Sequence, residues 1–260
     1  MTNAKPMSTP LLDFTEAADV QSNRLSDKQS SLYRSAVGKI NWLVRGSRPD
    51  LAYVISILAS YLSAPTERDW QNLKRVLRYL SGTKDLGITI GGSDPVGYSD
   101  ADYASTPDSG RKSTSGYIFL MGGPVTWSSK RQNAVALSST ESEYMALSHA
   151  GKEAVWLRNF CLELGIRGDA PIKLLCDNTS TITLTHNTNM HARTKHIDIR
   201  HHWIRDAVKN GAITVDYVGT QQQCADILTK VPKVDQLHRI LRLISMSRPR
   251  PTKRDSSYLE

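Results

Sequence analysis

The order of expected strands and helices between residues 96 and 230 is the feature that most restricts how this chain can fold. Three short, apolar or alternating segments come first and are separated by turn residues, a pattern typical of an antiparallel meander. A long apolar-periodic helix follows, and then a strand, two helices, a strand and a helix. In order, these elements are expected at 96–100, 113–120, 124–128, about 138–164, 172–176, about 180–186, about 194–209, 213–218 and from about 222. This order predicts an α/β fold, in which helices cover a mixed five-stranded sheet.

The sequence before this region has a helical pattern. Apolar residues recur at helical spacing from Leu32, and a second apolar stretch runs from Leu51 to Leu62. A third helix is expected between Thr66, which is a suitable N-cap, and Gly82. The chain is therefore expected to divide into a polar tail (1–30), a helical segment (31–92), an α/β domain (93–232), and an amphipathic piece with a disordered basic tail (233–260).

Charge and composition point to a polyanionic partner. The 260 residues carry a formal net charge of +8 and a pI near 9.4, and each phosphate that Lys or Arg neutralises releases counterions. The alternative is a solvated basic surface. Three cysteines (Cys161, Cys176 and Cys224) form no CxxC pair, which fits a reducing compartment without a disulfide framework or zinc site. No apolar run is long enough to span a bilayer, and the polar start lacks the apolar core of a signal peptide.

Four carboxylates stand where the expected elements begin or end, and no short motif contains them. Asp100 ends the first strand, Glu143 lies early in the long helix, Asp177 follows strand 172–176, and Asp226 opens the last helix. Converging carboxylate oxygens suit Mg²⁺ and Mn²⁺, and two such ions about 3.5–4 Å apart can stabilise both the attacking and the leaving oxygen of a phosphodiester displacement. Phosphodiester hydrolysis is therefore the leading hypothesis.

Six strings follow one another through the α/β region. They are YSDADYAS (98–105), RKSTSGYIFLMGG (111–123), WSSKRQNAVALSSTESEYMAL (127–147), LLCDNTSTI (174–182), HARTKHIDIRHHWIRD (191–206) and YVGTQQQCADILTK (217–230). In this order they resemble the ribonuclease H domain of copia-type retrotransposon Pol polyproteins. Residues 47–83 resemble the segment that joins reverse transcriptase to ribonuclease H in that family. The resemblance covers roughly residues 31–246.

The resemblance implies a ribonuclease H-like fold, preceded here by a small helical connection segment. It also implies that Asp100, Glu143, Asp177 and Asp226 are the catalytic residues and the ligands of two Mg²⁺ ions, for which Mn²⁺ can substitute. Asp100 would bridge both ions, with Glu143 and Asp177 on one side and Asp226 at the second ion. The two ions would activate a water and neutralise the departing 3′ oxygen.

Three further residues are auxiliary candidates at this site. Glu141 lies about 200° around the helix from Glu143, so both cannot face inward, and we favour Glu143 because it borders the apolar packing pattern. Asp102 either supports Asp100 from the same strand face or points to solvent after a turn at Ala101. Cellular ribonucleases H carry a histidine before the last acid, which loop 219–223 lacks; His196 either replaces it or serves in the core or in helix capping.

Basic and polar side chains in two regions are candidate contacts to nucleic acid. Lys74, Arg75 and Arg78 share the polar side of the third helix, which is either a solvated face or a strip along a duplex backbone. Near the expected acids, phosphates would contact basic residues, and 2′-hydroxyls of RNA would contact polar ones. The basic residues are Arg111, Lys112 and Lys130, and the polar residues are Ser113, Gln132 and Asn178. For Lys130, ordinary surface charge is the alternative.

The leading hypothesis is a metal-dependent endonuclease that cleaves the RNA strand of RNA–DNA hybrids, as the ribonuclease H of a retrotransposon Pol polyprotein. Its expected partner is the reverse transcriptase domain of the same polyprotein, and no membrane is expected. The alternatives are a noncatalytic nucleic-acid-binding remnant and a module that is active only when joined to a reverse transcriptase. The presence of all four acids favours the enzyme over the remnant. Its expected location is the cytoplasm, in a retroelement particle, or the nucleus.

Overall fold

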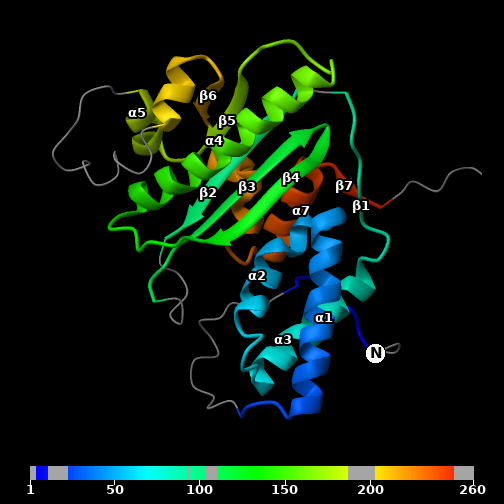
Figure 1. Cartoon of the computed structure of the whole chain (residues 1–260). Coiled ribbons are helices and arrows are strands. Elements are labelled where there is room, and N and C mark those ends of the chain that lie inside the picture. Colours follow the sequence, from blue (N-terminus) through cyan, green and yellow to red (C-terminus); the bar gives the residue numbers. More distant parts are fainter. Residues whose placement is uncertain (1–3, 11–22, 93, 104–109, 187–202, 249–260) are drawn as a thin grey trace, which may run out of the picture.

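A five-stranded mixed sheet forms the centre of the computed structural model, which describes residues 4–10, 23–92, 94–103, 110–186 and 203–248. The strands are β2 (Val96–Asp102), β3 (Thr114–Met121), β4 (Gly123–Arg131), β5 (Ile172–Cys176) and β6 (Ile213–Tyr217). Their order is β4-β3-β2-β5-β6; β2, β3 and β4 are antiparallel, whereas β5 is parallel to both β2 and β6. The expected α/β class, a mixed five-stranded sheet flanked by helices and preceded by a helical segment, is confirmed (Figure 1).

One face of the sheet is covered mainly by α4 (Ser139–Glu163) (Figure 1). The helix begins at the N-cap Ser138, whose hydroxyl accepts a hydrogen bond from the Glu141 amide. The shorter α5 (Thr179–His186) and a helical stretch at 203–209 complete this layer. Its core combines apolar side chains of α4 with those of three strands: Tyr144, Leu147, Ala150, Ala154, Leu157, Phe119, Ile172, Leu174 and Val215.

The opposite face packs on the N-terminal helices and on the segment that carries Asp226. These elements are α1 (Asp27–Gly46), the 3₁₀ helix η2 (Pro49–Leu51), α2 (Ala52–Ser60), α3 (Glu67–Gly82), the 3₁₀ helix η6 (Cys224–Leu228) and α7 (Val234–Leu243). Ile118 of β3 joins the same core as Leu58 of α2 and Leu228 of η6. The indole N–H of Trp127 on β4 also donates to the Val44 carbonyl of α1 at 2.9 Å. The helical segment and the sheet therefore share one hydrophobic core, while the domain boundaries given above stay predictions.

Two helix boundaries differ from the expectations. Helix α1 begins at Asp27, earlier than its apolar pattern indicated, because Ser26 and Gln29 form a capping box ahead of the first buried turn. The helix expected from about 222 is instead a pair of short 3₁₀ helices, η5 (Thr220–Gln222) and η6. The buried Gln223 separates the two, and its side chain accepts a hydrogen bond from the Ala225 amide.

A two-stranded antiparallel sheet joins distant parts of the chain. Strand β1 (Gly87–Ile88) follows α3 and pairs with β7 (Met246–Ser247) after α7. The expected disordered tail at 249–260 lies outside the described residues, as does the part of the expected helix from 194 to 202. Among the described helices, none is long and apolar enough to cross a membrane.

Candidate metal centre and nucleic-acid interface

The four predicted acids come from four elements that meet at one end of the sheet. Asp100 lies on β2, and Asp177 directly follows the parallel neighbour β5, so the carboxyl ends of adjacent strands place both side chains at the same edge. Glu143 lies in the second turn of α4, and Asp226 lies on η6. Asp100, Glu143 and Asp226 are buried, whereas Asp177 is half-buried.

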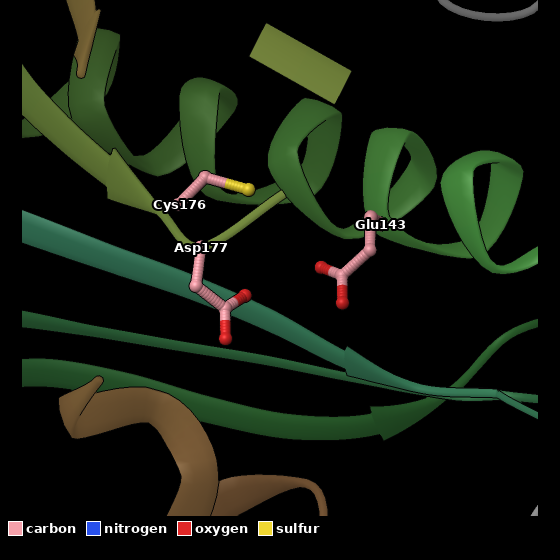
Figure 2. Close-up of side chains that lie close together, drawn as sticks. All are labelled: Glu143, Cys176 and Asp177. Carbon is pink, nitrogen blue, oxygen red and sulfur yellow. The ribbon is translucent and has the colours of Figure 1, made fainter. Parts of the chain in front are cut away.

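Glu143 and Asp177 form one half of the cluster. Figure 2 shows their carboxylates approaching one another beside Cys176, and the ligand atoms of all three residues lie within 4.8 Å of each other. Glu143 accepts a hydrogen bond from the Ala101 amide, but its Oε2 is buried and has no hydrogen-bond partner among the described residues. Burial, together with the charges of Asp100 and Asp177, raises the pKa of Glu143 well above its usual range.

Cys176 is a poor ligand for a hard cation although its sulfur belongs to this group. Burial raises the pKa of its thiol to about 12, and the nearby Glu143 charge adds to the effect. A neutral thiol does not match the preference of Mg²⁺ or Mn²⁺ for oxygen. The side chain instead packs in the core beneath α4.

Asp100 and Asp226 form the other half, and basic and polar side chains hold them. The Thr229 hydroxyl donates to Asp100 Oδ2. The Lys230 ammonium lies 2.7 Å from Asp226 Oδ1 and 3.9 Å from Asp100 Oδ2, and Gln236 Nε2 donates to Asp226 Oδ2 at 2.6 Å. Burial raises the pKa of both carboxyls; Lys230 opposes this rise without cancelling it. Burial acts to lower the pKa of Lys230, but the attraction of Asp100 and Asp226 outweighs it and raises that pKa.

The residues that hold this second half carry little signal in the sequence. Lys230 could have been found from its position four residues after Asp226, had that segment been recognised as a single turn. Gln223 is fully buried, and its Nε2 donates to the Ser99 carbonyl at 3.0 Å, next to Asp100. Gln223 therefore ties η6 to β2, and no local pattern signals this contact.

The donor set fits a hard divalent cation. It consists of four carboxylates at one place, three of them buried. Two buried carboxylate oxygens, Glu143 Oε2 and Asp226 Oδ1, have no hydrogen-bond partner among the described residues, although Asp226 Oδ1 lies 2.7 Å from the Lys230 ammonium. Burial of several like charges costs free energy unless a cation compensates them. Lys230 supplies one positive charge, which is fewer than the acids carry when ionised.

Comparisons with known proteins decide the family. No protein-family model matches this chain. The secreted RxLR effector protein 161 of Plasmopara viticola is 55% identical over 129 residues, which is 48% of this chain and 90% of that protein. The retrovirus-related Pol polyprotein from transposon TNT 1-94 of Nicotiana tabacum is 40% identical over 253 residues, and this match takes in 95% of the chain. The chain belongs to the copia-type retrotransposon Pol polyproteins.

This Pol chain spans less than a fifth of the length of the curated Pol polyproteins it matches, since it covers 19% of the tobacco polyprotein and 16% of the Arabidopsis thaliana ones. Among solved structures, the N-terminal RNase H domain of rv2228c from Mycobacterium tuberculosis aligns with 58% of this chain and 98% of that chain. The two share 13% sequence identity, and the TM-score is 0.39.

The auxiliary candidates of this Pol chain lie in different places. The Glu141 carboxylate accepts a hydrogen bond from the Leu137 amide at the start of α4, and the glutamate grouped with Asp177 is Glu143. Asp102 is still part of β2, so the turn considered at Ala101 does not occur, and the half-buried Asp102 shares a strand face with Asp100. His196 lies outside the described residues.

The N-terminal segment 4–10 covers part of the basic face of α3. Arg75 donates to the Thr9 hydroxyl at 2.8 Å, and Arg78 Nε donates to the Lys5 carbonyl at 2.6 Å. The Lys74 ammonium lies 5.7 Å from the centre of the Trp70 ring. Two of the three basic side chains thus contact the protein itself, so this face is neither simply solvated nor a fully free strip.

The other candidate contacts border the sheet. Arg111 and Lys130 are exposed, Lys112 is half-buried, and Ser113 is buried. The Gln132 amide nitrogen donates within the protein, to Ser115 Oγ and to the Ser142 carbonyl, both at 2.9 Å, and is therefore engaged. Asn178 Oδ1 accepts from the Thr181 amide at 2.9 Å and caps α5. The Asn178 side-chain nitrogen is the group of this residue that can donate a hydrogen bond to a ligand.

At Gly116 on β3 the sheet closely approaches η6 and Thr229. A Cβ there would lie 2.7 Å from Thr229 Cγ2 and 2.8 Å from Leu228 Cβ. We expect Gly116→Ala to destabilise the protein by about 1–3 kcal/mol and to lower any metal affinity, because Thr229 and Asp226 must shift. Urea unfolding and metal titration measure the two effects. The matched control is Gly38→Ala on α1, where nothing lies within 4 Å; equal destabilisation by both variants would contradict the close approach.

Proposed function

We propose that this chain is a ribonuclease H module, a metal-dependent endonuclease that cleaves the RNA strand of RNA–DNA hybrids. The observation that carries the proposal is the convergence of Asp100, Glu143, Asp177 and Asp226 at one end of the sheet. Family membership supports it, because the module would serve in a Pol polyprotein beside a reverse transcriptase domain. The predicted location in a retroelement particle or the nucleus is part of the same proposal.

The four acids would hold two divalent cations, Mg²⁺ or Mn²⁺. When bound, such ions supply charge neutralisation at a phosphodiester and lower the pKa of water. The chain's own contribution is to hold the carboxylates in place. Thr229 orients Asp100, Gln236 orients Asp226, and Gln223 anchors η6 to β2. A fixed carboxylate geometry reduces the reorganisation needed when the substrate binds.

Side chains around the acids would position the hybrid. Arg111 and Lys130 are exposed and would meet phosphates, which position a strand without reading its sequence. Asn178 is adjacent to Asp177, so its amide nitrogen would face the strand being cut, where a 2′-hydroxyl distinguishes RNA from DNA.

The decisive experiment is cleavage of a strand-labelled RNA–DNA hybrid by the full chain, with Mg²⁺, with Mn²⁺ and with EDTA. Matched duplex DNA and duplex RNA are the control substrates. We expect metal-dependent cleavage of the RNA strand in the hybrid alone. Tight hybrid binding without cleavage would instead favour the noncatalytic remnant, or a module that requires a joined reverse transcriptase. Adding a reverse transcriptase domain from a Pol relative would separate these two outcomes.

The basic face of α3 gives a prediction about binding. If Lys74 and Arg78 contact phosphates, Lys74→Ala with Arg78→Ala should weaken hybrid binding and reduce the slope of log K against log salt by about 1–2, since each phosphate contact contributes roughly 0.9. Fluorescence anisotropy at several salt concentrations measures that slope. The control pair, Lys28→Ala with Lys39→Ala, removes two exposed charges from α1. An unchanged slope in the α3 variant would show that this face does not contact the duplex.

A further inference from the structure

The two halves of the carboxylate cluster differ in how their charge is compensated. Lys230 lies within ion-pairing distance of Asp226 and Asp100, at 2.7 Å and 3.9 Å. Among the described residues, no lysine or arginine forms a salt bridge with Glu143 or Asp177, and Glu143 Oε2 is buried without a hydrogen-bond partner. Lys230 therefore pairs directly with one half of the cluster, and its charge acts on Glu143 and Asp177 only from beyond ion-pairing distance.

A metal ion bound by Asp226 and Asp100 would need the same place that the Lys230 ammonium occupies. An ammonium and a divalent cation compete for the same carboxylate oxygens, because each is attracted to Asp226 Oδ1 and Asp100 Oδ2. Lys230 can leave this position more easily than the acids can. Its side chain is 40% exposed, whereas those of Asp100 and Asp226 are 4% and 0% exposed. A flexible lysine stem can move its ammonium into solvent while the carboxylates stay in place.

We propose that Lys230 is a resident counter-ion of the Asp100–Asp226 half and makes the two divalent-cation positions unequal in affinity. The inference rests on the proposed function, because it concerns the same centre. The Glu143–Asp177 half would bind its ion first, with Asp100 as the shared ligand. The Asp100–Asp226 half would bind more weakly, since its ion must first displace the ammonium. Lys230 is thus a positioning residue that also keeps the buried acids compensated when no metal is bound.

The test is a calorimetric titration of the full chain with Mn²⁺, comparing the native sequence with Lys230→Met, which keeps the stem and removes the charge. We expect the native protein to bind one ion tightly and a second weakly. In Lys230→Met the weaker affinity should rise by about tenfold or more, because a unit charge within 4 Å of the site is removed. The tighter affinity should change much less. Lys173→Met is the matched control, because Lys173 pairs with Asp216 at 3.6 Å on the exposed surface of the sheet.

A second measurement separates the counter-ion role from a general effect on folding. In EDTA, Lys230→Met should melt below the native protein and below Lys173→Met, since Asp100 and Asp226 lose their cation. Saturating Mn²⁺ should restore its melting temperature to the native value. A purely structural role for Lys230 predicts a loss that Mn²⁺ does not restore.

The outcomes distinguish this inference from the proposed function. If native protein and variant both bind two ions with unchanged affinities, the counter-ion role is overturned and the metal centre stands. Equal strengthening of both ions by Lys230→Met would also overturn it, because the proposal assigns Lys230 to one half. If neither protein binds Mn²⁺, the proposed function fails, and this inference fails with it.

Discussion

Replacing Asp100 by asparagine is expected to reduce cleavage of the hybrid by about 10³-fold or more while the protein stays folded. Asp100 would be one of the ligands that hold the ions, and the charge stabilisation that such ions supply is worth several kcal/mol, at roughly tenfold in rate per 1.36 kcal/mol. Asparagine keeps the size of the side chain and an oxygen that accepts from the Thr229 hydroxyl. Binding of the hybrid should therefore change little. Single-turnover cleavage and anisotropy on the same preparation measure both effects.

The stability of this variant supplies an internal check. Burial, which Asp226 reinforces and Lys230 opposes, raises the folded-state pKa of Asp100 above its usual value of 3.8. A carboxyl whose folded pKa is raised favours folding at low pH, and this contribution is lost as the pH rises through that pKa. At neutral pH the ionised Asp100 thus lowers the stability of the metal-free protein. In EDTA at pH 7, Asp100→Asn should be at least as stable as the native chain.

Asp216→Asn on β6 is the control for Asp100→Asn. It changes an exposed strand aspartate in the same way, and its partner is the surface residue Lys173. Cleavage should stay within about twofold of native, since surface pairs of this kind contribute about 0–1 kcal/mol. Undiminished cleavage by Asp100→Asn, or an equal loss in both variants, would refute the assignment of Asp100 to the site.

Removing the buried carboxylate of Asp50 is expected to cost about 3–5 kcal/mol of folding free energy. Asp50 lies on η2, and its side chain is fully buried. Its two oxygens accept from Arg48 Nε and Nη2 at 2.9 and 2.7 Å, and Tyr79 donates its hydroxyl to Oδ2 at 2.8 Å. Arg48 also donates to the Thr83 carbonyl and hydroxyl. Asp50→Ala would leave the Arg48 guanidinium buried without its counter-charge, and urea unfolding measures the loss.

Two further variants test why Asp50 matters. The double change Arg48→Met with Asp50→Leu removes both charges together and should cost much less than Asp50→Ala, because no unpaired charge remains buried. Asp216→Ala breaks an exposed ion pair and should cost at most about 1 kcal/mol. If the double variant were as unstable as Asp50→Ala, lost hydrogen bonds and packing would account for the effect in place of the unpaired charge. The network joins η2 to the end of α3, so this loss would loosen the helical segment that shares a core with η6.

The strands and most helices could be predicted because local periodicity determines them. The strand at 172–176 coincides with β5, and the long helix expected at about 138–164 is α4 within one residue at each end. Helix α1 was placed too late because its first turn is polar and its start depends on a capping box. The segment around Asp226 was expected to be one helix, but the hydrogen bonds of Gln223 to Ser99 and Ala225 hold it as 3₁₀ turns. Side-chain contacts of this kind have no periodic signature.

The sequence by itself determined the order of the strands and helices, and it placed one acid at a boundary of each of four elements. Spacing along a strand or helix decides which side chains share a face. The resemblance to Pol polyproteins added the expectation that the four acids belong to one site. Only the tertiary structure decided which side chains meet across long separations. Lys230 reaches Asp100 from the far end of the chain, and residues 4–10 lie on α3. The tertiary structure also decided that η6 shares a core with the N-terminal helices. Such contacts depend on how whole elements pack, because a side chain's distant neighbours are set by the shape of the core and not by its neighbours in sequence.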